Sequence, residues 1–203
     1  DIFPGSRYGK RLPIGLMEVV DNFPHQALRD YYEKWYRPDL QGIVIVGDID
    51  VDEVEKKVKK IFKKIKKVKN PAERIYYPVD DNKEMIFSQQ IDKEQQNYVL
   101  QLMYKHDVPA RDQRNTKEYI RENTKRSFAI SMLNSRFSEI MSKDNPPYLR
   151  AGVGYSGFGV TETKTAFTVM VQCKPAQILE AIPRVFTEVG RARRFGFTQP
   201  EFD

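Results

Sequence analysis

The chain contains very few residues of the kinds that build metal or disulfide sites, with one cysteine and two histidines among 203 residues. A single cysteine excludes an internal disulfide and any site built from several thiolates. His25 and His106 lie in different predicted elements, and neither has a second histidine or a carboxylate three or four residues away on a helix. Because catalytic zinc sites commonly use three protein ligands, we expect both histidines to be surface residues.

Long apolar runs and common catalytic motifs are also absent. No stretch approaches the roughly 18 apolar residues of a membrane-spanning helix, and no charged-then-apolar leader opens the chain. Residues 152–157 match G-x-G-x-x-G, but a strand is predicted after the motif where a dinucleotide site needs a helix. We therefore interpret Gly152, Gly154, Gly157 and Gly159 as strand positions that another backbone approaches closely.

Hydrophobic residues make up 40% of the chain and aromatic residues 12%, which is enough for a packed core. In the first part, periodicity predicts a helix over 24–36, a strand over 43–46 covered on both faces, and a helix over 51–67 that Asp50 and Glu53 cap. Trp35 is expected to anchor the first helix to a sheet.

The second part alternates strands and helices. Strands are predicted over 84–91, 97–104, 149–158 and 164–174, and helices over 116–141 and 176–194. This order predicts an α+β fold, a two-layer sandwich in which an antiparallel or mixed sheet carries its helices on one face. Cys173 falls in an alternating apolar run, so we expect a buried, inert thiol.

Residues 68–82 contain Pro71, Pro78 and a polar turn, and no periodicity crosses them. We therefore predict a first domain over 1–69, a linker over 70–83 and a second α+β domain over 84–203. The chain begins with Asp1, and a helix start at Thr198, with Glu201 as its capping partner, lies just before its end. We expect the chain to be a piece of a longer protein, with the second domain truncated at its C-terminus.

One predicted helix, over 51–67, carries most of the net charge of +6. Clustered lysines can bind nucleic acid or anionic lipid. This helix has no arginine and no interleaved aromatic residue, so a solvated face is the favoured interpretation. The lysines of this helix and its end are Lys56, Lys57, Lys59, Lys60, Lys63, Lys64, Lys66, Lys67 and Lys69.

Several motifs together resemble the insulinase/pitrilysin family of zinc metallopeptidases. They are S-R-Y-x-x-R-x-P-I-G over 6–15, W-Y-R-P-D-L over 35–40 and V-G-D-I-D over 46–50. The resemblance is weaker beyond residue 82, where 132–137 and 196–201 still look like the family. It is closest to the bacterial exported or periplasmic subgroup, which favours a periplasmic or exported location.

Members of this family hold zinc through an H-x-x-E-H helix and a downstream glutamate, and two halves of the molecule enclose an unfolded peptide. The chain has no H-x-x-E-H, so the resemblance assigns it no zinc ligand and no catalytic residue. Residues 1–69 would be the C-terminal portion of the catalytic domain and 84–203 the non-catalytic domain. The zinc would lie upstream, and the chain would form the wall of a chamber for peptide or unfolded protein, beside the remaining domains or a partner subunit.

Two other functions stay open at this point. A metal-free scaffold subunit, of the processing-peptidase or respiratory-complex core type, would share the fold, and the lysine helix offers a weaker nucleic-acid alternative. An H-x-x-E-H motif upstream of Asp1 would favour the peptidase, and its absence the scaffold. Spacing does not decide whether Arg136, Tyr155 or Phe158 contacts substrate.

Overall fold

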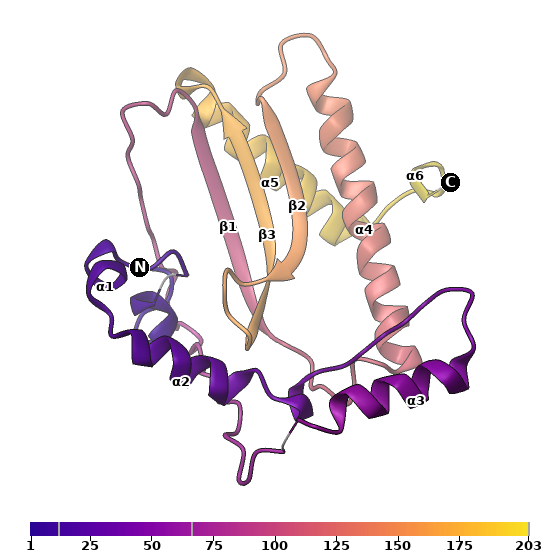
Figure 1. Ribbon diagram of the computed structural model, residues 1–203. Helices are drawn as coiled ribbons and strands as arrows, with labels where there is room; N and C mark the ends of the chain where they lie inside the picture. The colour runs from indigo at the N-terminus through magenta and orange to yellow at the C-terminus, as the bar shows by residue number, and fades with distance from the viewer. Residues whose placement is uncertain (12, 66, 203) are drawn as a thin grey trace. The chain divides into compact units, whose positions relative to one another are not determined.

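A computed structural model describes residues 1–11, 13–65 and 67–202 (Figure 1). Leu12, Lys66 and Asp203 lie outside the described residues. The chain divides into two compact units, one formed by Asp1–Arg11 with Tyr76–Asp203 and the other by Leu12–Ile75.

The larger unit is built on a three-stranded sheet of β1 (Tyr98–Asp107), β2 (Arg150–Gly157) and β3 (Lys164–Cys173). The strand order is β1-β3-β2 and both pairings are antiparallel. Val169 lies opposite Leu102 on one side and Val153 on the other. The predicted antiparallel sheet is confirmed, with three of the four predicted strands.

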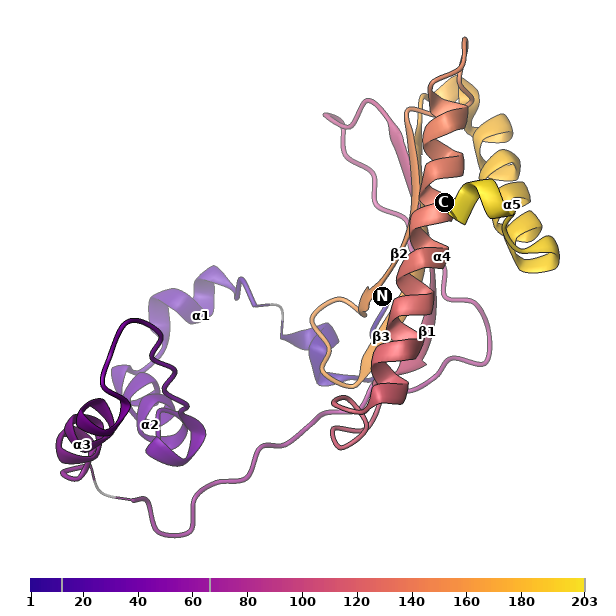
Figure 2. The same ribbon diagram turned by 90° about the vertical axis from the view of Figure 1, so that its right-hand side faces the viewer.

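Two helices, α4 (Lys117–Met141) and α5 (Ile178–Phe195), cover one face of this sheet. In Figure 1 the sheet faces the viewer and α5 passes behind it, and Figure 2 shows α5 to one side of the strands. The core between the layers consists of Leu133, Phe137, Ile140, Tyr148, Val153, Val169, Val171, Cys173, Ala181 and Val185. The α+β sandwich with helices on one face is confirmed, as is the burial of Cys173, whose thiol pKa is raised by that burial.

The free edge of β2 is closed by a side chain of α4. The Asn134 amide donates to the carbonyl oxygen of Val153 at 3.0 Å and accepts from its N–H at 2.8 Å. A Cβ on Gly152 would lie 3.3 Å from the same amide oxygen, whereas one on Gly154 would meet nothing within 4 Å. The close neighbour at Gly152 is thus a side chain and not the predicted backbone, and among the described residues Gly154 has no close neighbour.

A second cluster forms on the opposite face of the sheet. Phe3, Val79, Phe158 and Ala166 are all buried there. Gly159 has φ +59°, and a Cβ on it would lie 2.9 Å from the Phe3 ring, so this turn requires glycine. The first residues of the chain thus pack with the second half of the sequence, a contact that no local pattern predicts.

The smaller unit contains three α-helices among its described residues: α1 (Met17–Asn22), α2 (His25–Trp35) and α3 (Val51–Phe62). The Asp50 carboxylate accepts from the Glu53 N–H at 2.9 Å, as predicted. The helix predicted over 24–36 is confirmed, whereas α1 was not predicted. The extension of the helix to residue 67 is wrong, since α3 ends at Phe62 and Ile65 beyond it is 48% exposed and has no core to pack on in the described part of this unit.

The predicted buried strand at 43–46 is wrong. These residues form no strand, and their exposure ranges from 48% at Ile45 to 91% at Val46. A strand needs a neighbour for its backbone groups, and the described part of this unit contains none. For the same reason Trp35 anchors no sheet. Its side chain is only partly buried, and the Lys34 ammonium lies 5.1 Å from the centre of its ring.

Two predictions in the larger unit are also wrong. Residues 84–91 form no strand, and Met85 and Phe87 are 77% and 80% exposed. In the helix predicted over 176–194, the apolar periodicity predicts a buried Leu179, but this side chain is 88% exposed. The rest of the predicted stripe packs on the core, where Val185 is fully buried and Ile182, Phe186 and Val189 are partly buried.

Candidate functional site

Neither histidine belongs to a cluster of three or more metal-binding side chains in the described part of the chain. His25 opens α2 and is exposed, with its ring 6.2 Å from Phe23, and His106 is exposed in β1. Both surface predictions are confirmed. Among the described residues, no group of three or more histidine, cysteine, aspartate or glutamate side chains is arranged to hold a metal ion. None of the described helices has the length and apolar character that a membrane span requires.

A cluster of aromatic and charged side chains, two of them exposed and three partly buried, lies on the face of the sheet next to α4. We call it the aromatic surface, and it consists of Tyr104, His106, Tyr155 and Phe167 from the strands with Arg126 from α4. The register places Tyr104 and Tyr155 on either side of Phe167. Tyr104 is 51% exposed, so the surface is open to a ligand.

Tyr155 is the centre of the aromatic surface. Its hydroxyl lies 2.8 Å from the Thr165 hydroxyl, and the Arg126 guanidinium lies 4.0 Å from its ring centroid. The His106 ring is 6.0 Å away. A cation stacked on an aromatic ring is held in place while its edge remains able to bind a carboxylate. The surface therefore suits apolar and acidic side chains of an extended chain.

Arg136 and Phe158, the two other side chains singled out in the sequence, are structural. Arg136 is 9% exposed, donates to the Glu201 carboxylate and to the Gly196 carbonyl at 2.9 Å, and stacks on Phe197. Phe158 is 5% exposed and packs against Phe3. Neither side chain is available to a ligand.

The ion pair of Arg136 predicts a specific acid sensitivity. Arg136 and the N–H of Thr198 lower the pKa of Glu201 from 4.5 to about 2. The pair therefore stabilises the fold fully above pH 4.5, and that contribution is lost as the pH falls toward 2. We expect the melting midpoint of wild type to fall more steeply across this range than that of Glu201→Gln. Parallel pH profiles of the two proteins would contradict the assignment.

The lysines of α3 form a solvated face. Lys57 and Lys59 have side chains 74% and 73% exposed, and each pairs with a glutamate four residues earlier on the same helix. The apolar stripe of α3 is not covered either, since Ile61 is 66% exposed. The exposure and the ion pairs of these lysines are consistent with a solvated face, and the described residues of this unit form no sheet against the stripe.

Comparison with known proteins places the chain in a family. The model of the peptidase M16 inactive domain matches residues 22–203. A zinc protease PQQL-like protein of Arabidopsis thaliana is 30% identical over 150 residues, 73% of the chain and 15% of that protein. The probable zinc protease PqqL of Escherichia coli is 24% identical over 202 residues, 100% of the chain and 21% of that protein.

The fold also matches a solved structure. The first half of the periplasmic protease PqqL from Escherichia coli superimposes with a TM-score of 0.79 at 22% identity, covering 98% of the chain and 42% of that structure. The chain thus spans about a fifth or less of the length of the curated relatives described above. It belongs to the peptidase M16 inactive domain family and is similar to PqqL-type zinc proteases.

Proposed function

We propose that the chain is the non-catalytic part of one half of a periplasmic zinc metalloendopeptidase, and that it forms a wall of the chamber that encloses the substrate. The observation that carries the proposal is the match of the inactive-domain model to residues 22–203. The relatives are named zinc proteases, which supports zinc in the parent protein. The zinc and its ligands would lie upstream of Asp1.

In this proposal, residues 1–69 complete a catalytic-type domain, 70–83 link it to the second domain, and 84–203 form most of the non-catalytic domain. The exposed apolar surface of the smaller unit supports this division. Val44, Val46 and Ile61 are 88%, 91% and 66% exposed, and apolar surface of this extent normally packs against another part of a protein.

The substrate proposed is an extended segment of an unfolded protein. Such a segment presents apolar and acidic side chains together, and the aromatic surface offers Tyr104 and Phe167 for the former and Arg126 for the latter. Among the described strands, β1 pairs only with β3, so its other edge can pair with peptide backbone.

The test is binding of an unfolded protein by the purified chain. We expect fluorescein-labelled, reduced and carboxymethylated lactalbumin to bind saturably in an anisotropy titration. Arg126→Gln should weaken binding about fivefold, since the loss of one partly exposed ion pair with a substrate carboxylate costs about 1 kcal/mol. Arg121→Gln is the matched control, because Arg121 lies on the same helix, is 69% exposed and pairs only with Glu118 among the contacts described.

The outcomes separate the proposal from its alternatives. Equal affinities for the two arginine variants would contradict the role of the aromatic surface. No binding by wild type would favour a metal-free scaffold, and tighter binding of duplex DNA than of unfolded protein at physiological salt would favour the lysine helix. Melting midpoints of the variants check that each is folded.

A further inference from the structure

Helix α5 exposes two large apolar side chains outside the stripe that packs on the core. Its inner stripe, with Ala181 and Val185 fully buried, packs on the sheet. Leu179 near the start of the helix is 88% exposed and Phe195 at its end is 81% exposed. A surface helix needs only one apolar stripe to pack on its own domain, so neither side chain has a role in the core of this unit.

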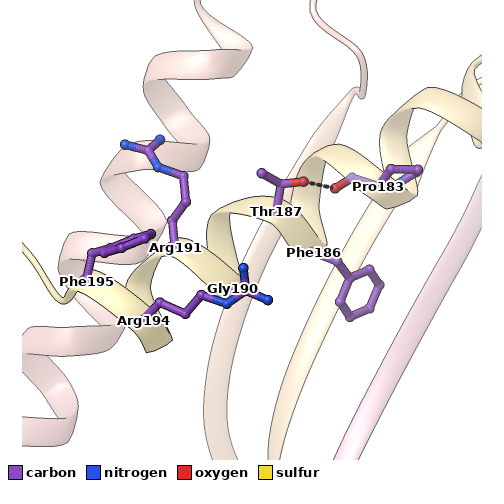
Figure 3. A pocket seen from close by; sticks show the side chains of 7 residues that line it. All are labelled: Pro183, Phe186, Thr187, Gly190, Arg191, Arg194 and Phe195. Carbon is purple, nitrogen blue, oxygen red and sulfur yellow. Dashed lines mark hydrogen bonds between the residues drawn. The ribbon is translucent and has the colours of Figure 1, made fainter.

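The outer side of α5 is hollowed into a shallow groove of about 430 Å³. Figure 3 shows its lining, which consists of Pro183, Phe186, Thr187, Gly190, Arg191, Arg194 and Phe195. The Thr187 hydroxyl donates to the Pro183 carbonyl oxygen at 2.7 Å. A Cβ on Gly190 would meet nothing within 4 Å. The floor at Gly190 is therefore open, and the groove has room for a few side chains.

The charge at the groove is of one sign. No acidic residue lines it. The Arg191 guanidinium lies 2.8 Å from the Glu188 carboxylate. The Glu188 side chain is only 1% exposed, and the Arg184 guanidinium lies 3.2 Å from the same carboxylate. Arg194 has no ion pair among the described residues. One arginine is thus held in place at the rim while a second remains available to an incoming carboxylate.

We propose that this groove docks a short acidic segment of another protein, in which an aspartate or glutamate lies next to a large apolar side chain. The apolar side chain would lie over Gly190 between Phe186 and Phe195, and its neighbouring carboxylate would pair with Arg194. A volume of this size holds side chains and not a folded domain. The apolar lining favours protein over nucleic acid, whose recognition needs several cations along a backbone or stacked aromatic residues. This site lies on α5 and does not depend on the aromatic surface.

The test uses the whole chain and a fluorescein-labelled 12-residue peptide of alternating glutamate and leucine or phenylalanine. We expect saturable binding in an anisotropy titration, and no saturable binding of the same peptide with lysine in place of glutamate. Arg194→Glu should weaken binding at least tenfold, because it replaces an attraction by a repulsion. The neighbouring Arg193→Glu changes the net charge equally outside the groove and should alter affinity less than twofold.

A second variant keeps the test independent of charge. A Cβ at position 190 has no neighbouring atom within 4 Å, so the tryptophan of Gly190→Trp can fill the floor of the groove. This variant should abolish peptide binding, while its melting midpoint stays near that of wild type. Equal effects of Arg193→Glu and Arg194→Glu, equal binding of the lysine peptide, or unchanged binding by Gly190→Trp would overturn the proposal. Arg126→Gln should leave peptide binding at the groove unchanged. The groove proposal and the proposed function are therefore tested separately, because the loss of one binding activity does not imply the loss of the other.

Discussion

Phe137→Ala is expected to lower the free energy of unfolding of the larger unit by about 3 to 5 kcal/mol. Phe137 is 1% exposed in the centre of the core and meets the Tyr148 ring edge-on at 6.5 Å. The Tyr148 hydroxyl in turn donates to the Phe137 carbonyl oxygen at 3.0 Å. Truncation leaves a cavity that this fixed ring cannot fill. Urea denaturation followed by circular dichroism measures the change.

Phe87→Ala is the matched control for this experiment. It removes the same atoms from a residue that is 80% exposed, so it should change the free energy of unfolding by less than about 0.5 kcal/mol. Similar losses for the two variants would show that the core does not lie between α4, α5 and the sheet. It would also show that residues 84–91 are packed, in contrast to the structure.

The second large effect on stability is expected when a buried carboxylate loses both of its ion-pair partners. Glu188 is 1% exposed, and its carboxylate receives Arg184 at 3.2 Å and Arg191 at 2.8 Å. The double variant Arg184→Met, Arg191→Met keeps most of the aliphatic stems but leaves the negative charge unpaired. We expect a loss of about 3 to 5 kcal/mol in the free energy of unfolding.

Two further variants show whether the unpaired charge causes this loss. Adding Glu188→Gln to the double variant should restore most of the stability, because a neutral amide is far less costly to bury. Arg193→Met, which removes an exposed arginine of the same helix with no ion pair among the described residues, should have no measurable effect. If Glu188→Gln restores nothing, the loss comes from the arginine stems and the charge argument is wrong.

The sequence predicts elements well where local pattern and burial agree. The alternation in β3 specifies which side chains face the helices, and Thr116 specifies the start of α4, where its hydroxyl accepts from the Tyr119 N–H at 3.2 Å. Antiparallel pairing then follows from the order of the elements. These features depend on residues that lie close together in the chain, so they can be predicted from a single sequence.

Contacts between distant residues could not be predicted in this way. The Asn134 amide on the edge of β2, the packing of Phe3 under Gly159 and the pairing of Arg126 with Tyr155 all join separate segments. The error at 43–46 has a different cause, since an apolar run predicts a buried strand only if a neighbouring strand is present. Tyr155 was noticed as a candidate substrate contact, but its cationic partner was not, because nothing in its spacing marks Arg126.

The most direct test of the account measures zinc content, peptidase activity and unfolded-protein binding on one preparation of the chain. The account predicts no stoichiometric zinc after incubation with the metal and dialysis, no cleavage of carboxymethylated lactalbumin, and saturable binding of that protein that Arg126→Gln weakens. About one tightly held zinc per chain together with cleavage of the bound protein would contradict it.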